Sequence, residues 1–387
     1  MSRAKPVAAF GYDRSPEEAH ISEAVDVVIV GGGVTGLAAA GEIAAAGRSV
    51  VVLERHPRPG MEMSTHNSAV IHAGLYYPPQ SLKGTLCLEG AERLYKFCRQ
   101  YDVPHDQCGK FVVASTTEEV SLLERLKAGA EANGVRNLSI VGEADVRKRE
   151  PKIRALAAMW SPGSGRVEAE ALVRTLRKIA ASRDAIVLSG TPVINAEPQP
   201  DGFAVRTERE TIVGRAVVNA AGLYADDVSR ILGGESFRIY PVRGEYAELK
   251  PARSSWLNGL VYPLPHASGH GLGVHFTKTV GGRVMLGPTA QYQKDKDDYE
   301  RNRLPLDHFL ESARVLMPEL TLDDLTFGGT GIRAKLHPPE EKFADFIIRR
   351  DTKQPALVQA AGIESPGLTA CLSVGARIAT LVKQVLG

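Results

Sequence analysis

Residues 25–54 read VDVVIVGGGVTGLAAAGEIAAAGRSVVVLE, and the expected fold follows from this stretch. The apolar run at 25–30 has the length and β-branched content of a buried strand, and residues 49–53 repeat that pattern. Between them, a glycine-rich turn leads into an alanine-rich segment at 37–46, which is typical of a helix. The stretch therefore predicts a strand–helix–strand unit with two parallel, buried strands.

The three spaced glycines of the turn predict a dinucleotide site. Gly31 makes the tight turn, Gly33 lets the backbone approach a pyrophosphate, and Gly36 allows the helix to pack closely on the strand. The helix N-terminus offers free N–H groups and a positive dipole end to the phosphates. Glu54, at the end of the second strand, accepts hydrogen bonds from ribose hydroxyls and would repel a 2′-phosphate. These residues fit either NAD or FAD.

Two further features favour FAD. The glycine motif opens the chain, and a second cluster of small residues follows much later, at 217–222 (VVNAAG). That segment predicts a buried strand whose small terminal residues suit a second close pass of the backbone over the dinucleotide. We therefore expect FAD as the cofactor.

The composition excludes several other classes of protein. The 387 residues are 24% charged and 43% hydrophobic, which is typical of a globular chain. The net charge is +2 and no run of lysines or arginines occurs, so no nucleic-acid partner is expected. No apolar stretch reaches the roughly 18 residues of a membrane span, and residues 1–20 do not resemble a secretory signal. The four cysteines form no C-x-x-C pair, which predicts reduced thiols in a cytoplasmic protein.

The order of predicted elements indicates two interleaved domains of an α/β protein. We expect a discontinuous, Rossmann-like FAD-binding domain and an inserted substrate domain with a mixed β-sheet. The expected FAD-binding segments are 21–85, 140–225 and 326–387. The expected substrate-domain segments are 86–139 and 226–325, and residues 1–20 form an N-terminal extension.

The glycine motif with Glu54, the Asn219–Gly222 segment and the glycine-rich start of the last helix resemble the D-amino-acid-oxidase-like FAD oxidoreductases. Two stretches further resemble L-2-hydroxyglutarate dehydrogenases, which are also called oxidases. They are STHNSAVIHAGLYY at 64–77, continuing through Cys108–Lys110, and GVHFT at 273–277 with the Leu286–Pro288 segment. The sequence departs from better-known members at 291–305, which is short and charged, and at 362–370 (GIESPGLTA). These departures bear on the substrate more than on the chemistry.

The resemblance implies oxidation of a 2-hydroxy acid to the 2-oxo acid, most directly L-2-hydroxyglutarate to 2-oxoglutarate. The flavin takes a hydride from the α-carbon, and the protein supplies a proton acceptor and a counter-charge for the carboxylate. We expect His275 as the base, with His72 as an alternative base or substrate ligand. His66 is expected near the substrate, and His66 and His72 have no spacing that predicts a metal site. His266, His270 and His337 lie in predicted turns and are expected at the surface.

Two arginines are expected to bind the substrate carboxylate, because a guanidinium pairs with a carboxylate bidentately. Arg333 follows a glycine-rich run and resembles the arginine that holds the substrate carboxylate in related amino-acid oxidases. Arg243 is the second candidate, and a structural salt bridge is the alternative for both. Tyr76, Tyr77 and Tyr262 are candidates to close the pocket.

The start of the last helix is expected to stabilise negative charge on the reduced flavin. FAD is expected to be noncovalent, since no cysteine lies between 109 and 370, where some relatives attach it. The residues expected to bind FAD are Gly31, Gly33, Val34, Thr35, Gly36, Glu54, Arg55, Ser64, His66, Asn67, Ala221, Gly222, Gly331, Gly367, Leu368 and Thr369.

Other activities stay open from the sequence. An amine or amino-acid oxidase of the same superfamily would need no strong base, and a non-catalytic flavin-binding subunit would bind FAD that no small acid reduces. The electron acceptor is oxygen, a quinone or a carrier protein. A quinone acceptor would place the protein peripherally on the inner membrane.

Overall fold

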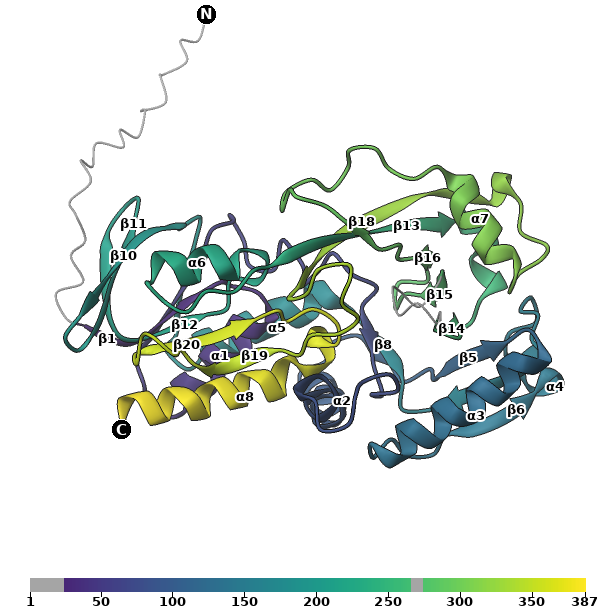
Figure 1. Cartoon of the computed structure of the whole chain (residues 1–387), viewed down its shortest axis with the longest axis horizontal. Helices are drawn as coiled ribbons and strands as arrows, with labels where there is room; N and C mark the ends of the chain where they lie inside the picture. The colour runs from purple at the N-terminus through teal and green to yellow at the C-terminus, as the bar shows by residue number, and fades with distance from the viewer. Residues whose placement is uncertain (1–23, 266–273) are drawn as a thin grey trace, which may run out of the picture.

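The computed structural model describes residues 24–265 and 274–387, and its two large sheets confirm the expected α/β class. In Figure 1, an eight-stranded sheet with helices α1 (Val34–Ala45) and α8 (Gly367–Leu386) forms one half of the molecule. A nine-stranded sheet forms the other half, and a three-stranded sheet that contains β8 (Gly165–Val167) lies between them. The expected N-terminal extension, 1–20, lies outside the described residues.

The eight-stranded sheet is built around the predicted strand–helix–strand unit. Its order is β10-β11-β12-β1-β2-β9, with β20 on β12 and β19 on β20. The central pairs, β12 with β1 and β1 with β2, are parallel, as the continuous apolar runs predict. The strands are β1 (Val25–Val30), β2 (Val50–Glu54), β9 (Ile186–Ser189), β10 (Val193–Gln199), β11 (Gly202–Thr207), β12 (Thr211–Asn219), β19 (Ile347–Arg350) and β20 (Leu357–Ala361).

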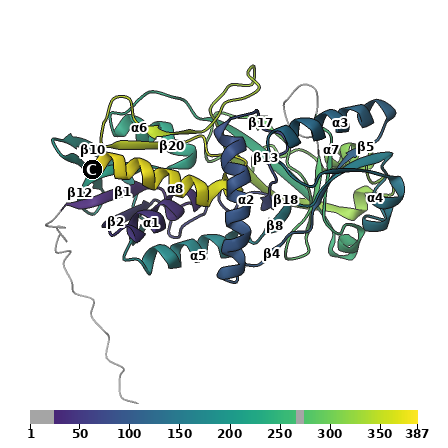
Figure 2. The same cartoon turned by 90° about the horizontal axis from the view of Figure 1, so that it is seen from below.

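Helix α1 is buried between this sheet and other helices. It packs against α8 and α5 (Ala169–Ala181), and α8 in turn packs against α2 (Leu82–Gln100), as Figure 2 shows from below. By length and composition, α8 is the only described helix that could span a membrane. One of its faces, which carries Val374 and Ile378, is buried in the core with residues of α1 and β20, so α8 is a core helix here.

The nine-stranded sheet is mixed, as expected, since β14 pairs parallel with β5 while its other pairs are antiparallel. Its order is β17-β13-β16-β15-β14-β5-β7-β6, with β18 on β13. Helices α3 (Thr117–Ala132), α4 (Glu143–Arg149) and α7 (Leu306–Arg314) pack on it. The strands are β5 (Lys110–Ala114), β6 (Ser139–Gly142), β7 (Ala157–Ser161), β13 (Tyr240–Leu249), β14 (Leu260–Pro263), β15 (His275–Lys278), β16 (Val284–Gly287), β17 (Gln291–Tyr292) and β18 (Leu325–Lys335).

The strand pairing and helix packing differ from the expected domain division at several segments. Strand β7 and all but the first residue of β6 lie within 140–225, which is expected in the FAD-binding domain, yet β7 pairs with β5 of the nine-stranded sheet. Strand β18, all but its first residue within 326–387, likewise pairs with β13 of that sheet. Helix α2 overlaps 86–139, which was expected in the substrate domain, yet it packs on α8. None of these partners is a neighbour in sequence, so local patterning does not reveal the pairing.

The packing of α1 on α8 depends on Gly375, and this generates a stability prediction. A Cβ at Gly375 would lie 2.7 Å from the backbone carbon of Ala38, which cannot move aside. We expect Gly375→Ala to lower the free energy of unfolding by about 1–3 kcal/mol, as overpacking of a close contact does. The measurement is urea-induced unfolding followed by circular dichroism.

Gly129→Ala is the matched control. Gly129 also lies within a helix, α3, but its Cβ would meet no atom within 4 Å. We expect this variant to gain about 0.5–1 kcal/mol from helix propensity. Equal unfolding free energies for the two variants would show that the contact between α1 and α8 is not tight.

Candidate active site

A cavity of about 400 Å³ lies between the two large sheets. The first sheet contributes the turn after β1 and the end of β2, and the second contributes Tyr262, His275 and Arg333. Loops at 60–72 and 363–368 complete its walls. Most residues expected to bind FAD line it, namely Gly31, Gly33, Val34, Thr35, Glu54, Arg55, Ser64, His66, Asn67, Ala221, Gly222, Gly331, Gly367 and Leu368.

The glycine turn leaves room only for backbone. Gly31 has a φ of +112° and its N–H donates to the carbonyl of Leu53 at 2.8 Å. A Cβ at Gly31 would overlap the carbonyl oxygen of Ala220, and a Cβ at Gly36 would overlap that of Gly31. Gly36 does not line the cavity, which agrees with its expected packing role.

Helix α1 begins at the cavity, and its N-cap residue, a glycine, has no side chain to cap the first turn. Gly33 is the N-cap residue, and the N–H of Val34 donates to Ser64 Oγ at 3.0 Å. An uncapped helix N-terminus combines free N–H donors with the positive end of the helix dipole, which suits a pyrophosphate. The residues present therefore fit the dinucleotide that the sequence predicts.

Glu54, the last residue of β2, also lines the cavity, and backbone N–H groups hold its carboxylate in place. Its carboxylate accepts from the N–H groups of Gly32 at 2.9 Å and His56 at 2.8 Å. Burial raises the pKa of Glu54, and these two donors act against that rise. Arg55 lines the cavity too, but its guanidinium pairs with Glu62 and lies 3.9 Å from the ring centroid of Tyr224.

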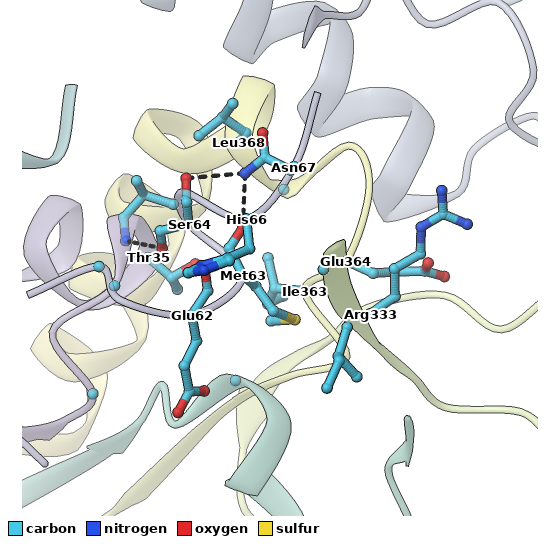
Figure 3. Close-up of a pocket in the computed structure, with 18 of the residues that line it drawn as sticks. Thr35, Glu62, Met63, Ser64, His66, Asn67, Arg333, Ile363, Glu364 and Leu368 are labelled. Carbon is cyan, nitrogen blue, oxygen red and sulfur yellow. Dashed lines mark hydrogen bonds between the residues drawn. The ribbon is translucent and has the colours of Figure 1, made fainter. Parts of the chain in front are cut away.

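Asn67 stabilises the loop at 60–72 through hydrogen bonds to the backbone of the same loop. The Asn67 amide donates to the carbonyls of Met63 at 2.7 Å and Ser64 at 3.0 Å, and its oxygen accepts from the N–H of Ala69. Gly331 of β18 packs on the carbonyl of His66, where any side chain would overlap. Figure 3 shows this loop on one side of the cavity and Arg333 with Glu364 on the other.

The second helix start at the cavity is that of α8. Gly367 and Leu368 line the cavity, and no side chain caps this end. Thr369 does not line it. Its hydroxyl accepts from the backbone N–H of His72 at 3.0 Å and donates to the carbonyl of Val70 at 3.3 Å. Thr369 thus fixes the loop that carries His72.

Two histidines and one arginine meet at this end of the cavity. The rings of His275 and Tyr262 are stacked, with centroids 3.6 Å apart and planes at 12°. His72 Nε2 lies 3.3 Å from Ser365 Oγ. Burial, reinforced by the charges of Lys110 and Arg333, lowers the pKa of His72 to about 3, so this imidazole is neutral near pH 7.

Arg333 lines the cavity without a protein counter-ion in contact. Among residues 24–265 and 274–387, no side chain forms an ion pair or hydrogen bond with its guanidinium. A half-buried guanidinium with all its donors unused is a site for an anion from outside the chain.

Arg243 and Tyr76 are not part of the cavity lining. Arg243 is buried and pairs with Glu245 at 2.9 Å, which favours the alternative of a structural salt bridge for this residue. His66 lines the cavity near the expected pyrophosphate, and its exposed ring contacts Tyr299. His337 is buried, contrary to expectation, while His266 and His270 lie outside the described residues.

Sequence reasoning missed Glu364 as a cavity residue. This buried carboxylate pairs with Lys83 at 2.9 Å and Lys335 at 3.5 Å. Burial alone would raise its pKa, but the two lysines and Arg333 lower it to about 2, so it is ionised. The signal in the sequence was the departure at 362–370, which places a carboxylate beside the expected flavin site.

The glycine turn generates the next prediction. Gly33 has an extended backbone (φ −76°, ψ −179°) that valine also adopts, and its Cβ would meet only the movable Ser64 Oγ, at 2.9 Å. Gly33→Val is therefore expected to fold but to purify with less than about a tenth of the wild-type flavin, because the side chain fills the place of the pyrophosphate.

Gly142→Val is the control, since Gly142 is the N-cap of α4 with a similar backbone and open space around it. The measurement is flavin absorbance per chain after gel filtration. A fully yellow Gly33→Val protein would contradict the dinucleotide assignment.

Comparison with known proteins agrees with this geometry. The family described as FAD dependent oxidoreductase (DAO) matches residues 26–381. Mitochondrial L-2-hydroxyglutarate dehydrogenase of Arabidopsis thaliana is 33% identical, over 92% of this chain and 83% of the relative. The Escherichia coli K12 L-2-hydroxyglutarate dehydrogenase is 29% identical over 93% and 94%.

Solved structures show the same fold. L-α-glycerophosphate oxidase of Mycoplasma pneumoniae with FAD bound superposes with a TM-score of 0.85 and 27% identity, over 93% of this chain and 95% of that one. Glycine oxidase of Geobacillus kaustophilus, with a TM-score of 0.80 and 24% identity, shares the fold. The chain belongs to the DAO family of FAD-dependent oxidoreductases.

Proposed function

We propose that this protein oxidises L-2-hydroxyglutarate to 2-oxoglutarate with noncovalent FAD as the hydride acceptor. The relatives that cover most of the chain carry that activity in their names. The observation that carries the proposal is Arg333, a guanidinium with no contacting counter-ion among the described residues, in the same cavity as the glycine motif and two histidines. An oxidoreductase for a neutral substrate would not need such a charge there.

FAD, when bound, supplies the hydride acceptor, and the protein supplies position and charge. The start of α1 and Glu54 hold the pyrophosphate and the ribose, and the start of α8 places N–H donors at the other end of the cavity. Arg333 binds the carboxylate on the reacting carbon through two parallel hydrogen bonds, which fixes the direction in which the α-hydrogen points.

A neutral imidazole removes the hydroxyl proton as the hydride leaves. His275 is our first candidate, because it lies in the cavity and its ring is held flat against Tyr262. His72 is the second, because it also lines the cavity, but the low pKa of its imidazole makes it the weaker base. The two are separated by experiment below.

The amine or amino-acid oxidase remains the alternative function, since several structural neighbours carry such names. An amine substrate is oxidised as the neutral base and has no hydroxyl proton to lose. Loss of His275 would then leave turnover nearly unchanged. The same variant that tests the base therefore separates the two functions.

For the electron acceptor we propose oxygen, a quinone or a carrier protein, and for the location the cytoplasm or the inner-membrane surface. Turnover of L-2-hydroxyglutarate with oxygen, with a soluble quinone analogue and with a dye acceptor compares these routes. The proposal as a whole is tested by the product. Stoichiometric 2-oxoglutarate from the L enantiomer supports it, and its absence with every acceptor contradicts it.

Arg333→Ala is expected to lower kcat/KM for L-2-hydroxyglutarate by about 10²-fold or more, mainly through KM, because two charge-assisted hydrogen bonds are lost. Flavin content is the check on folding. Arg177→Ala, an exposed arginine of α5, is the control and should change neither constant. An unchanged kcat/KM for Arg333→Ala would remove this residue from the substrate site.

His275→Gln is expected to lower kcat by about 10²–10⁴-fold, the usual contribution of a general base. His72→Gln should then keep a kcat within about tenfold of wild type, since it affects only the surroundings of the reaction. The measurement is single-turnover flavin reduction under anaerobic conditions. The reverse order of effects would assign the proton to His72.

A further inference from the structure

Three strands of the second sheet present polar side chains on one face toward the cavity. Leu260 of β14 is in register with Lys110 of β5 on one side and with Thr277 of β15 on the other. Tyr262 and His275, two residues further along their strands, lie on that same face and line the cavity. Lys110 is therefore placed directly beside the wall of the active site.

Lys110 is buried without a partner for its amine. Its side chain is 1% exposed, and no described residue accepts a hydrogen bond from Nζ. Nζ lies 4.6 Å from the ring centroid of Tyr262 and 4.9 Å from that of Tyr76. A buried lysine is almost always paired, so an unpaired one needs an explanation.

The ring of Tyr76 lies beside the amine of Lys110, and the buried Tyr76 hydroxyl likewise lacks a hydrogen-bond partner among the described residues. Two unsatisfied donors thus lie close together, one from the loop that carries His72 and one from the sheet below it. Each is costly to bury unless an acceptor arrives from outside the chain.

The charges around Lys110 leave it without an anion. The titratable groups nearest it are Cys87 of α2, His72 and Tyr76 of the covering loop, and Tyr262 of β14. His275 of β15 is stacked on Tyr262, and the charge of Arg333 of β18 acts on His72 and Tyr262. Burial raises the pKa of the Cys87 thiol to about 12, so it is neutral. Burial lowers the pKa of Lys110 itself to about 7.

We propose that Lys110, together with Tyr76, binds the carboxylate farthest from the reacting carbon and so selects dicarboxylic 2-hydroxy acids. The inference rests on the proposed function, in which Arg333 holds the other carboxylate. His72 lines the cavity and interacts electrostatically with both Lys110 and Arg333, so a substrate beside His72 lies near both cations, with Lys110 and Tyr76 just behind the cavity lining. The cationic form of Lys110 is the one that binds.

The test compares two substrates that differ only in the distal carboxylate, L-2-hydroxyglutarate and L-2-hydroxybutyrate. Lys110→Met is expected to lower kcat/KM for the dicarboxylate by about 10- to 100-fold, the value of one charge-assisted hydrogen bond. For L-2-hydroxybutyrate the change should stay within about threefold. Tyr76→Phe should lower the ratio of kcat/KM for L-2-hydroxyglutarate to kcat/KM for L-2-hydroxybutyrate in the same direction, by a smaller factor.

The same set of variants also checks that the protein still folds. Lys110→Met replaces a buried amine with an apolar chain of similar length, so its thermal midpoint should not fall below that of wild type. Lys148→Met and Tyr101→Phe, at exposed positions, are the matched controls and should leave the substrate ratio unchanged. Equal losses for both substrates in Lys110→Met would overturn the proposal, because a merely supporting role acts on both alike.

Calorimetry of the holoenzyme with 2-oxoglutarate provides a readout that needs no turnover. Above the Lys110 pKa of about 7, wild type should take up a proton on binding and its Kd should rise with pH. Lys110→Met should show weaker binding and no such uptake. Proton uptake that persists in Lys110→Met would refute the assignment even if L-2-hydroxyglutarate proved not to be the substrate.

Discussion

The close packing of backbone at the end of β1 is the constraint on which the rest of the structure depends. Gly31 lies against Ala220 of the segment after β12, and Gly36 lies against Gly31, with no space for a side chain at either position. This packing brings the uncapped start of α1 to the point where two parallel strands end. The same small residues leave the empty volume above them, which is where a dinucleotide fits.

The other half of the cavity is governed by charge. Arg333 has no contacting counter-ion among the described residues, and Lys110 has no partner at all there. Glu364 is shared by Lys83 and Lys335. The basic side chains therefore outnumber the single carboxylate in this half of the cavity, which favours an anionic substrate. An amino-acid oxidase for glycine or proline would need to balance only one carboxylate.

Local sequence patterns were sufficient for the features that depend on local geometry. The strand–helix–strand unit follows from residue type and spacing, and the structure has it, with Gly31 and Gly36 in the close backbone contacts that their spacing predicts. The pairing of Arg243 with Glu245, two residues away on the same strand, was not evident from residue type and spacing, because it depends on the burial of both side chains. The placement of β7 and the isolation of Lys110 depend on contacts between distant segments, which no periodicity encodes.

The most direct measurement is anaerobic reduction of the purified, flavin-loaded protein by a panel of substrates. The panel holds both enantiomers of 2-hydroxyglutarate, L-lactate, malate, glycine, sarcosine and proline. The account predicts rapid loss of the oxidised-flavin absorbance with L-2-hydroxyglutarate, with one 2-oxoglutarate formed per flavin. Bleaching by an amine but not by any hydroxy acid, or by no member of the panel, would contradict it.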